Sequence, residues 1–315
     1  MKRIFLLLSI LFCVDAAAQM LSDSSVVIMG HWKKGLTMSY KMSRSNYKII
    51  DNDTTEFRKT DQTLVFKVLK AKKDSYKIRL STHDYELSGD DPNGVYGVMA
   101  ALKGSDILFT TDAYGSLVSI DNMDQIREEG LQAVRVAVDA AQQNKGQVLP
   151  PEAISYIEKM VTDPAAIKQA LTDYMKIFCF HGMHMEIGEV LEYDTKIPSI
   201  LPGVATLLDA KGKVYLDSEL TDSESAVGHV HIYSDGESAM KFLSDSMKGL
   251  QKGLNAEHLD QVIDSFADMK YEELLSIEIY LPAGIPIQSY YDKYVDLVID
   301  GVRVRSGQSE SVELL

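Results

Sequence analysis

The hydrophobic period of this chain changes at residue 121, and that change limits the folds open to it. In residues 107–111 and 117–120, side chains alternate with a period of two, as in β-strands, around turn residues 112–115. From Met123 onward, apolar residues recur at helical spacing, and Asn122 with Gln125 predicts a capping box at the start of that helix. A hairpin therefore runs directly into a long amphipathic helix.

The residues before this hairpin have the pattern of an antiparallel sheet with one side in water. Apolar and polar side chains alternate in residues 36–43, and again in 64–69 and 76–81 on either side of the turn residues 72–75. The polar face of this second hairpin is basic. It indicates either the solvated face of an edge strand or a stripe that binds an anionic ligand.

The residues after the hairpin form a helical block over 122–179. Further helices are expected to begin at Pro151 and Pro164, since proline is well placed at the first helical position. Gly130 lies on the apolar face of the first helix, where we expect it to permit close approach to the strands.

Strand periodicity returns from about Met185. Turn residues 209–212 predict a hairpin within 205–216, and helical patterns follow at 239–250 and 257–269. The chain closes with a regular hairpin, in which residues 285–299 lead through Asp300 and Gly301 into a last strand.

These patterns predict an α+β protein with an extended, curved antiparallel sheet, resembling a half-barrel, and with helices 122–179 and 236–269 packed on one face. The two β segments are expected to form one continuous fold. Along the chain, the expected organisation is a signal peptide (1–18), an N-terminal β segment (19–120), a helical insertion (121–180) and a C-terminal β segment with helices (181–315).

The first residues have the pattern of an export signal. Lys2 and Arg3 precede an apolar run over 4–14 that is too short to span a bilayer, and small residues follow at 16–18. Cleavage is predicted between Ala18 and Gln19. We therefore expect a periplasmic or secreted protein that is soluble after cleavage.

Charge and cysteine content limit the partners and the redox chemistry. The net charge of −14 disfavours nucleic acid and anionic membrane surfaces as partners. Of the two cysteines, only Cys179 would remain after cleavage, so no internal disulfide can form. Its neighbours Phe178 and Phe180 favour a buried thiol.

Histidines form the sharpest candidate constellation. His181 and His184 follow Cys179 closely, and His229 and His231 would share one face of a strand. If the two segments pair, these four imidazoles could hold zinc or copper. Their spacing matches no specific metal motif, and the alternative is a set of ordinary histidines of a partly exposed sheet.

Catalytic motifs are absent from the sequence. It has no nucleophile elbow, no zinc-protease motif and no phosphate-binding glycine loop. Tyr290 and Tyr294 share a strand face near the C-terminus, where they could stack a sugar, line a cavity or form ordinary cross-strand pairs. No catalytic residue or obligatory cofactor is predicted.

The order of several short motifs resembles a known group of proteins. Lys34 and Gly35 open into a tyrosine-containing strand, the 112–115 hairpin leads into Asn122 and a helix, and 186–190 begins a strand. This order resembles the secreted β-rich proteins of unknown function of Gram-negative bacteria. Residues 282–286 are similar to the turn of lipoprotein-carrier-like half-barrels. The resemblance implies a curved sheet packed on helices, with an apolar concavity and no inherited catalytic residues.

Two functions fit these observations. The first is an exported, non-enzymatic envelope protein that holds an apolar small molecule or a protein partner in the curved sheet. The alternative is a metal-binding envelope protein that uses the four histidines. Neither requires nucleic acid or a membrane span that remains after signal removal.

The export hypothesis predicts the N-terminus of the mature protein. Expressed in a Gram-negative host, the protein should be recovered outside the cytoplasm with Gln19 as its first residue, because signal peptidase reads the small residues that end at Ala18. Edman sequencing of the fractionated protein tests this. Full-length protein confined to the cytoplasm would contradict it.

Overall fold

The computed structural model describes residues 20–22, 25–89, 106–143, 151–197, 207–217, 224–249 and 266–315. The predicted signal peptide, its cleavage site between Ala18 and Gln19, and most of the helix predicted over 257–269 lie outside these ranges.

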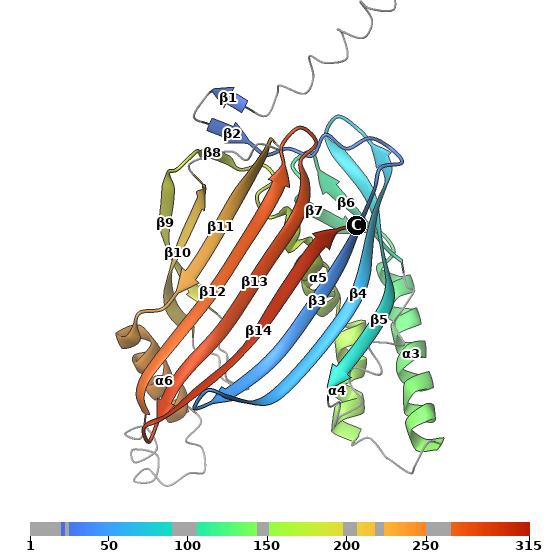
Figure 1. Cartoon of the computed structure of the whole chain (residues 1–315). Helices are drawn as coiled ribbons and strands as arrows, with labels where there is room; N and C mark the ends of the chain where they lie inside the picture. The colour runs from blue at the N-terminus through green and yellow to red at the C-terminus, as the bar shows by residue number, and fades with distance from the viewer. Residues whose placement is uncertain are drawn as a thin grey trace, which may run out of the picture.

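A single antiparallel sheet of eleven strands dominates the described chain (Figure 1). Its order is β7-β6-β5-β4-β3-β14-β13-β12-β11-β10-β9. The strands are β3 (Thr37–Ile50), β4 (Asp53–Ala71), β5 (Ser75–Gly89), β6 (Ile107–Asp112), β7 (Leu117–Ile120), β9 (Val190–Ile197), β10 (Leu208–Leu216), β11 (Ser225–Tyr233), β12 (Phe266–Tyr280), β13 (Ile285–Ile299) and β14 (Val302–Leu314). A small second sheet contains β1 (Met20–Ser22), β2 (Ser25–Val27) and β8 (His184–Glu186).

The last strand joins the two halves of the sheet. β14 pairs with β13 on one side and with β3 on the other, so that Val312 lies opposite both Ser289 and Met42. The strands that precede and follow the helical block thus form one sheet. The α+β class and the extended antiparallel sheet predicted from the sequence are confirmed.

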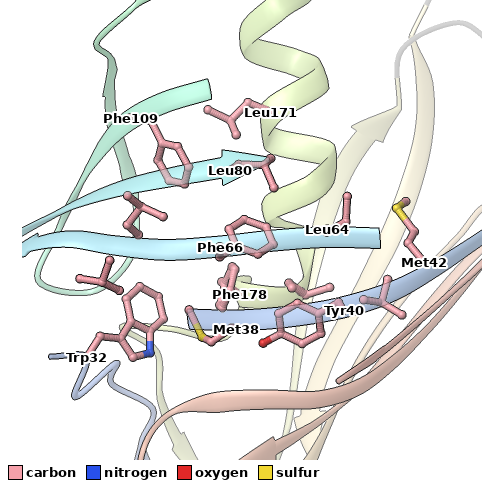
Figure 2. Packing of buried hydrophobic residues seen from close by; sticks show 14 residues of the cluster. Trp32, Met38, Tyr40, Met42, Leu64, Phe66, Leu80, Phe109, Leu171 and Phe178 are labelled. Carbon is pink, nitrogen blue, oxygen red and sulfur yellow. The ribbon is translucent and has the colours of Figure 1, made fainter. Parts of the chain in front are cut away.

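The two faces of the sheet differ as the alternation predicts. Met38, Tyr40 and Met42 are at most 2% exposed, while the residues between them are partly or fully exposed. The dry side chains of β3–β6 form a core with the helical segment 171–178 (Figure 2). We call this side the covered face and the opposite side the wet face.

The helices lie on the covered face. They are α3 (Met123–Gln143), α4 (Pro151–Thr162), α5 (Pro164–Met175), the 3₁₀ helix η2 (Lys176–Phe178) and α6 (Gly236–Gly249). α5 begins as predicted, with Pro164 in its first turn and the Asp163 carboxylate accepting a hydrogen bond from the Ala165 amide at 2.9 Å. α6 packs on β10 and β12 at the other end of the sheet.

Two neighbouring phenylalanines connect the halves of the core. Phe178 packs with the side chains of β3–β6, whereas Phe180 packs with those of β10–β13. Gly228 lies directly beneath the Phe180 ring, since a Cβ there would come within 2.7 Å of it. The turn after α5 therefore contributes one aromatic ring to the core of each half of the sheet.

Several local predictions are wrong. Residues 208–216 form one continuous strand instead of a hairpin. Gly212 lies within this strand and contacts the Tyr193 ring, where a side chain would not fit. Residues 266–269 begin β12 and are not helical. The basic hairpin β4–β5 is not at an edge, since β6 and β7 extend the sheet beyond it. Its Lys77 pairs with Asp121 at 2.9 Å.

Another error concerns Asn122. Its side chain accepts a hydrogen bond from the Leu108 amide at 2.9 Å and donates one to the Asp106 carbonyl at 2.7 Å. The side chain thus ties the start of α3 to strand β6 instead of capping the first helical amides. Its contact with the Gln125 side chain, at 3.4 Å, is the remnant of the expected box.

The middle of the first helix packs on its neighbour α4. Val134 is 1% exposed and lies in a cluster with Ile157 and Val161 of α4. A Cβ at Gly130 would lie 2.9 Å from the Val161 Cβ. The close approach that Gly130 permits is therefore between α3 and α4, which corrects the expected contact with the sheet.

This packing predicts the response to substitutions in α3. Gly130→Leu should lower the free energy of unfolding by about 1–3 kcal/mol, despite the better helix propensity of leucine, because the side chain would meet Val161. Val134→Asp should cost several kcal/mol, since it buries an unpaired carboxylate.

Urea denaturation followed by circular dichroism measures both effects. Glu128→Leu, at an exposed position of the same helix, serves as the control and should change stability by no more than about 0.5 kcal/mol. A Gly130→Leu protein as stable as this control would place residue 130 outside the α3–α4 contact.

Candidate functional site: an apolar pocket under the helices

An apolar pocket of about 180 Å³ lies between the helical block and strands β4–β6. The sheet forms its floor and helices α3, α4 and α5 form its roof. The floor residues are Gln62, Leu80, Thr82, Tyr85 and Ile107, and the roof residues are Ile126, Gly130, Met160, Val161, Ala166, Ile167, Ala170 and Tyr174.

Small residues leave this space open. On α5, Leu171 is buried in the core, whereas Ala166, Ile167 and Ala170 line the pocket. An (i, i+4) pair of alanines lies on one helix face and leaves a hollow between roof and floor. Met160 is 39% exposed and marks the side of the pocket that opens to water.

One end of the pocket is polar. The Gln62 side-chain amide contacts the Tyr174 hydroxyl at 3.5 Å and donates to the Met42 sulfur at 3.2 Å. The Arg44 guanidinium interacts electrostatically with Tyr174, but two of its nitrogens already donate to Glu310 Oε2, at 2.9 and 2.7 Å. The group offered to a ligand at this end is therefore neutral.

A polar cluster continues along the covered face toward its centre. The Lys176 ammonium lies 3.5 Å from the centre of the Tyr291 ring, and Glu273 accepts hydrogen bonds from the hydroxyls of Tyr271 and Tyr291. Burial lowers the pKa of Lys176, although nearby carboxylates oppose the shift. The cations of this cluster are thus matched by carboxylates.

Cys179 differs from its prediction. Phe178 and Phe180 are buried in the two cores, whereas Cys179 between them is exposed. The protein that surrounds the thiol nevertheless desolvates it and raises its pKa to about 12. The thiol therefore stays protonated near neutral pH and is a poor nucleophile.

The histidines do not form a common site. His181 is buried, and its two ring nitrogens lie 3.1 Å from the Phe178 carbonyl and 2.8 Å from that of Gly284. Its burial lowers the pKa of the imidazole. His184, by contrast, is exposed at the edge of the small sheet, 3.9 Å from Glu186. Within the first segment, one histidine is thus a core residue and the other a surface residue.

The second pair lies on the wet face of β11, as the strand pattern predicts. His229 contacts Asp217 at 3.0 Å and stacks on Tyr215, while His231 lies 3.6 Å from Glu272. Across all described ranges, no three or more His, Cys, Asp or Glu side chains are grouped so as to hold a metal ion. The described structure therefore does not bring together the four histidines predicted to hold zinc or copper, since His181, His184, His229 and His231 lie in different surroundings.

Apart from Gly130, for which the sequence predicts close packing, the pocket residues are not singled out by the sequence. Ala166, Ala170 and Gly130 fit an ordinary amphipathic pattern, and the hollow arises only when three helices meet the sheet.

None of the helices in the described part of the chain is long and apolar enough to cross a membrane.

Comparisons with known proteins give a likeness of fold. No family model matches the chain, and no curated protein matches it. Among solved structures, one of lipovitellin, determined to describe lipid–protein interactions in that protein, aligns with 90% of this chain at 8% sequence identity and a TM-score of 0.45. The alignment covers 25% of the lipovitellin chain, so this protein spans about a quarter of that length.

Proposed function

We propose that the protein is an exported, non-enzymatic binding protein that holds the apolar part of a small amphiphilic molecule between helices α3–α5 and strands β4–β6. The observation that supports this most directly is the composition of the pocket. Nine of its lining residues are aliphatic residues, glycine or methionine, and the others contribute an amide and three hydroxyl groups. Binding sites for small molecules commonly combine apolar walls with a few polar groups.

The volume limits the ligand. A dry apolar cavity of about 150 Å³ is sufficient for a benzene-sized molecule, whereas sites for drug-sized ligands begin at about 300 Å³. A pocket of about 180 Å³ therefore fits a single ring or a short alkyl chain. A longer chain would leave through the open side at Met160.

The polar end selects the head group. The Gln62 amide and the Tyr174 hydroxyl can exchange hydrogen bonds with a hydroxyl or carbonyl group of the ligand. Arg44 is already paired with the nearly buried Glu310, so it offers no unpaired charge to a carboxylate. A neutral head group is therefore favoured over an acid.

The composition of the pocket does not support catalysis. Its described lining contains no histidine, cysteine, lysine or carboxylate, so it supplies no nucleophile paired with a base. Binding is the function that remains for a pocket of this composition.

Titration with 1-octanol and with octanoate tests the proposal. Isothermal calorimetry at pH 7 should show octanol binding more tightly than octanoate, since the polar end is neutral. Ala166→Leu should weaken octanol binding at least about tenfold, because the added carbons occupy the pocket. Ala165→Leu is the matched control, as this exposed alanine on the same helix does not line the pocket.

Both variants should melt within a few degrees of the unmodified protein, which excludes unfolding as the cause. Absence of octanol binding, or equal affinities in the two variants, would contradict a ligand site under the helices.

A further inference from the structure

The wet face of the sheet carries a second, larger depression. Its volume is about 460 Å³, and it crosses β3, β14, β13, β12 and β11. At a spacing of about 4.8 Å between strands, these five strands extend over about 19 Å. The depression is therefore a trough that runs across the strands, on the opposite face from the apolar pocket.

One cross-strand row forms the floor of this trough. Ser43 lies opposite Ser311, Ser311 opposite Tyr290, and Tyr290 opposite Ser276. Side chains directly opposite one another on a sheet are close neighbours. Tyr290 lies between two short serines in this row and is 53% exposed.

The row next to it forms a polar rim. Lys41, Glu313, Gln288 and Glu278 lie opposite one another in that order. Glu278 is held in place, because it accepts hydrogen bonds from the Gln288 amide at 3.1 Å and from the Ser225 hydroxyl at 2.6 Å. The rim thus presents fixed acceptors beside the exposed ring.

The neighbouring tyrosine has a different role. Tyr294 is 9% exposed, donates a hydrogen bond to Glu272 and lies beneath the Arg305 guanidinium, 4.4 Å from the ring centre. Of the two tyrosines that share this strand face, only Tyr290 presents its ring to a ligand.

We propose that this trough binds a neutral oligosaccharide, with one sugar ring stacked on Tyr290. Sugar rings have C–H groups on their faces and hydroxyls at their edges, so an exposed aromatic ring bordered by hydroxyls and carboxylates matches them. The rim carries one ammonium and two carboxylates, an excess of negative charge that disfavours phosphorylated or sulfated ligands. A length of about 19 Å suits an extended chain of several sugars more than a single ring.

Calorimetric titration with four uncharged hexasaccharides tests the proposal: cellohexaose, maltohexaose, xylohexaose and N-acetylchitohexaose. At least one should bind in the millimolar range or tighter. Tyr290→Ala should weaken that binding at least about tenfold, since the stacking surface is lost. Ser276→Leu should weaken it as well, because a larger side chain beside the ring closes the trough.

Tyr156→Ala is the matched control. Tyr156 is 62% exposed on α4, away from the trough, and its removal should leave the sugar affinity unchanged. All variants should retain the melting temperature of the unmodified protein within a few degrees. Binding by none of the four sugars, or binding that Tyr290→Ala weakens no more than Tyr156→Ala does, overturns the proposal. Ala166→Leu, which fills the apolar pocket, should not affect sugar binding, so the two proposed sites fail or succeed separately.

Discussion

The pairing of β14 with β3 is the interaction on which the rest of the structure depends. It runs from the Val304–Ile50 pair to the Leu314–Tyr40 pair and makes one sheet of two segments that are far apart in the sequence. The ion pair between Arg44 and Glu310 lies directly on it, with Glu310 only 4% exposed. Leaving the Glu310 carboxylate buried without its partner costs several kcal/mol, and a slip by one residue would turn every side chain to the other face. The register is therefore strongly specified where the two halves meet.

Once the halves are joined, the division between covered face and wet face creates two different environments. On the covered face, helices α3–α5 meet the sheet, and the alanines of α5 leave an apolar hollow. On the wet face, the trough lies where short side chains adjoin long ones. Both candidate sites thus have the same physical origin, which is a run of small residues in a surface of larger ones.

Secondary structure that depends on the spacing of apolar residues can be predicted from the sequence. The role of a residue cannot be predicted where it depends on a neighbour from another part of the chain. The alternation of Met38, Tyr40 and Met42 was sufficient to identify a half-buried strand, because a period of two has one structural meaning. Gly212 was misread as a turn because its partner, the Tyr193 ring, comes from another strand. Asn122 was misread as a cap because β6 offers it better partners. The candidate sites belong to this second class, since a hollow between three helices and a sheet has no signature in any one segment.

The two edges of the sheet are protected in different ways. β7 has only four residues and leads directly into α3. β9, the other edge strand of the described sheet, is twice as long and exposes Leu191 and Tyr193. Its remaining positions include Glu192, Asp194 and Lys196, with Lys196 paired to Asp209 and Glu192 to Lys213. A strand from a second molecule could add here only by desolvating these charges and breaking their pairs. The charged residues of β9 therefore disfavour polymerisation through this edge. The net charge of −14 adds a repulsion between copies of the chain.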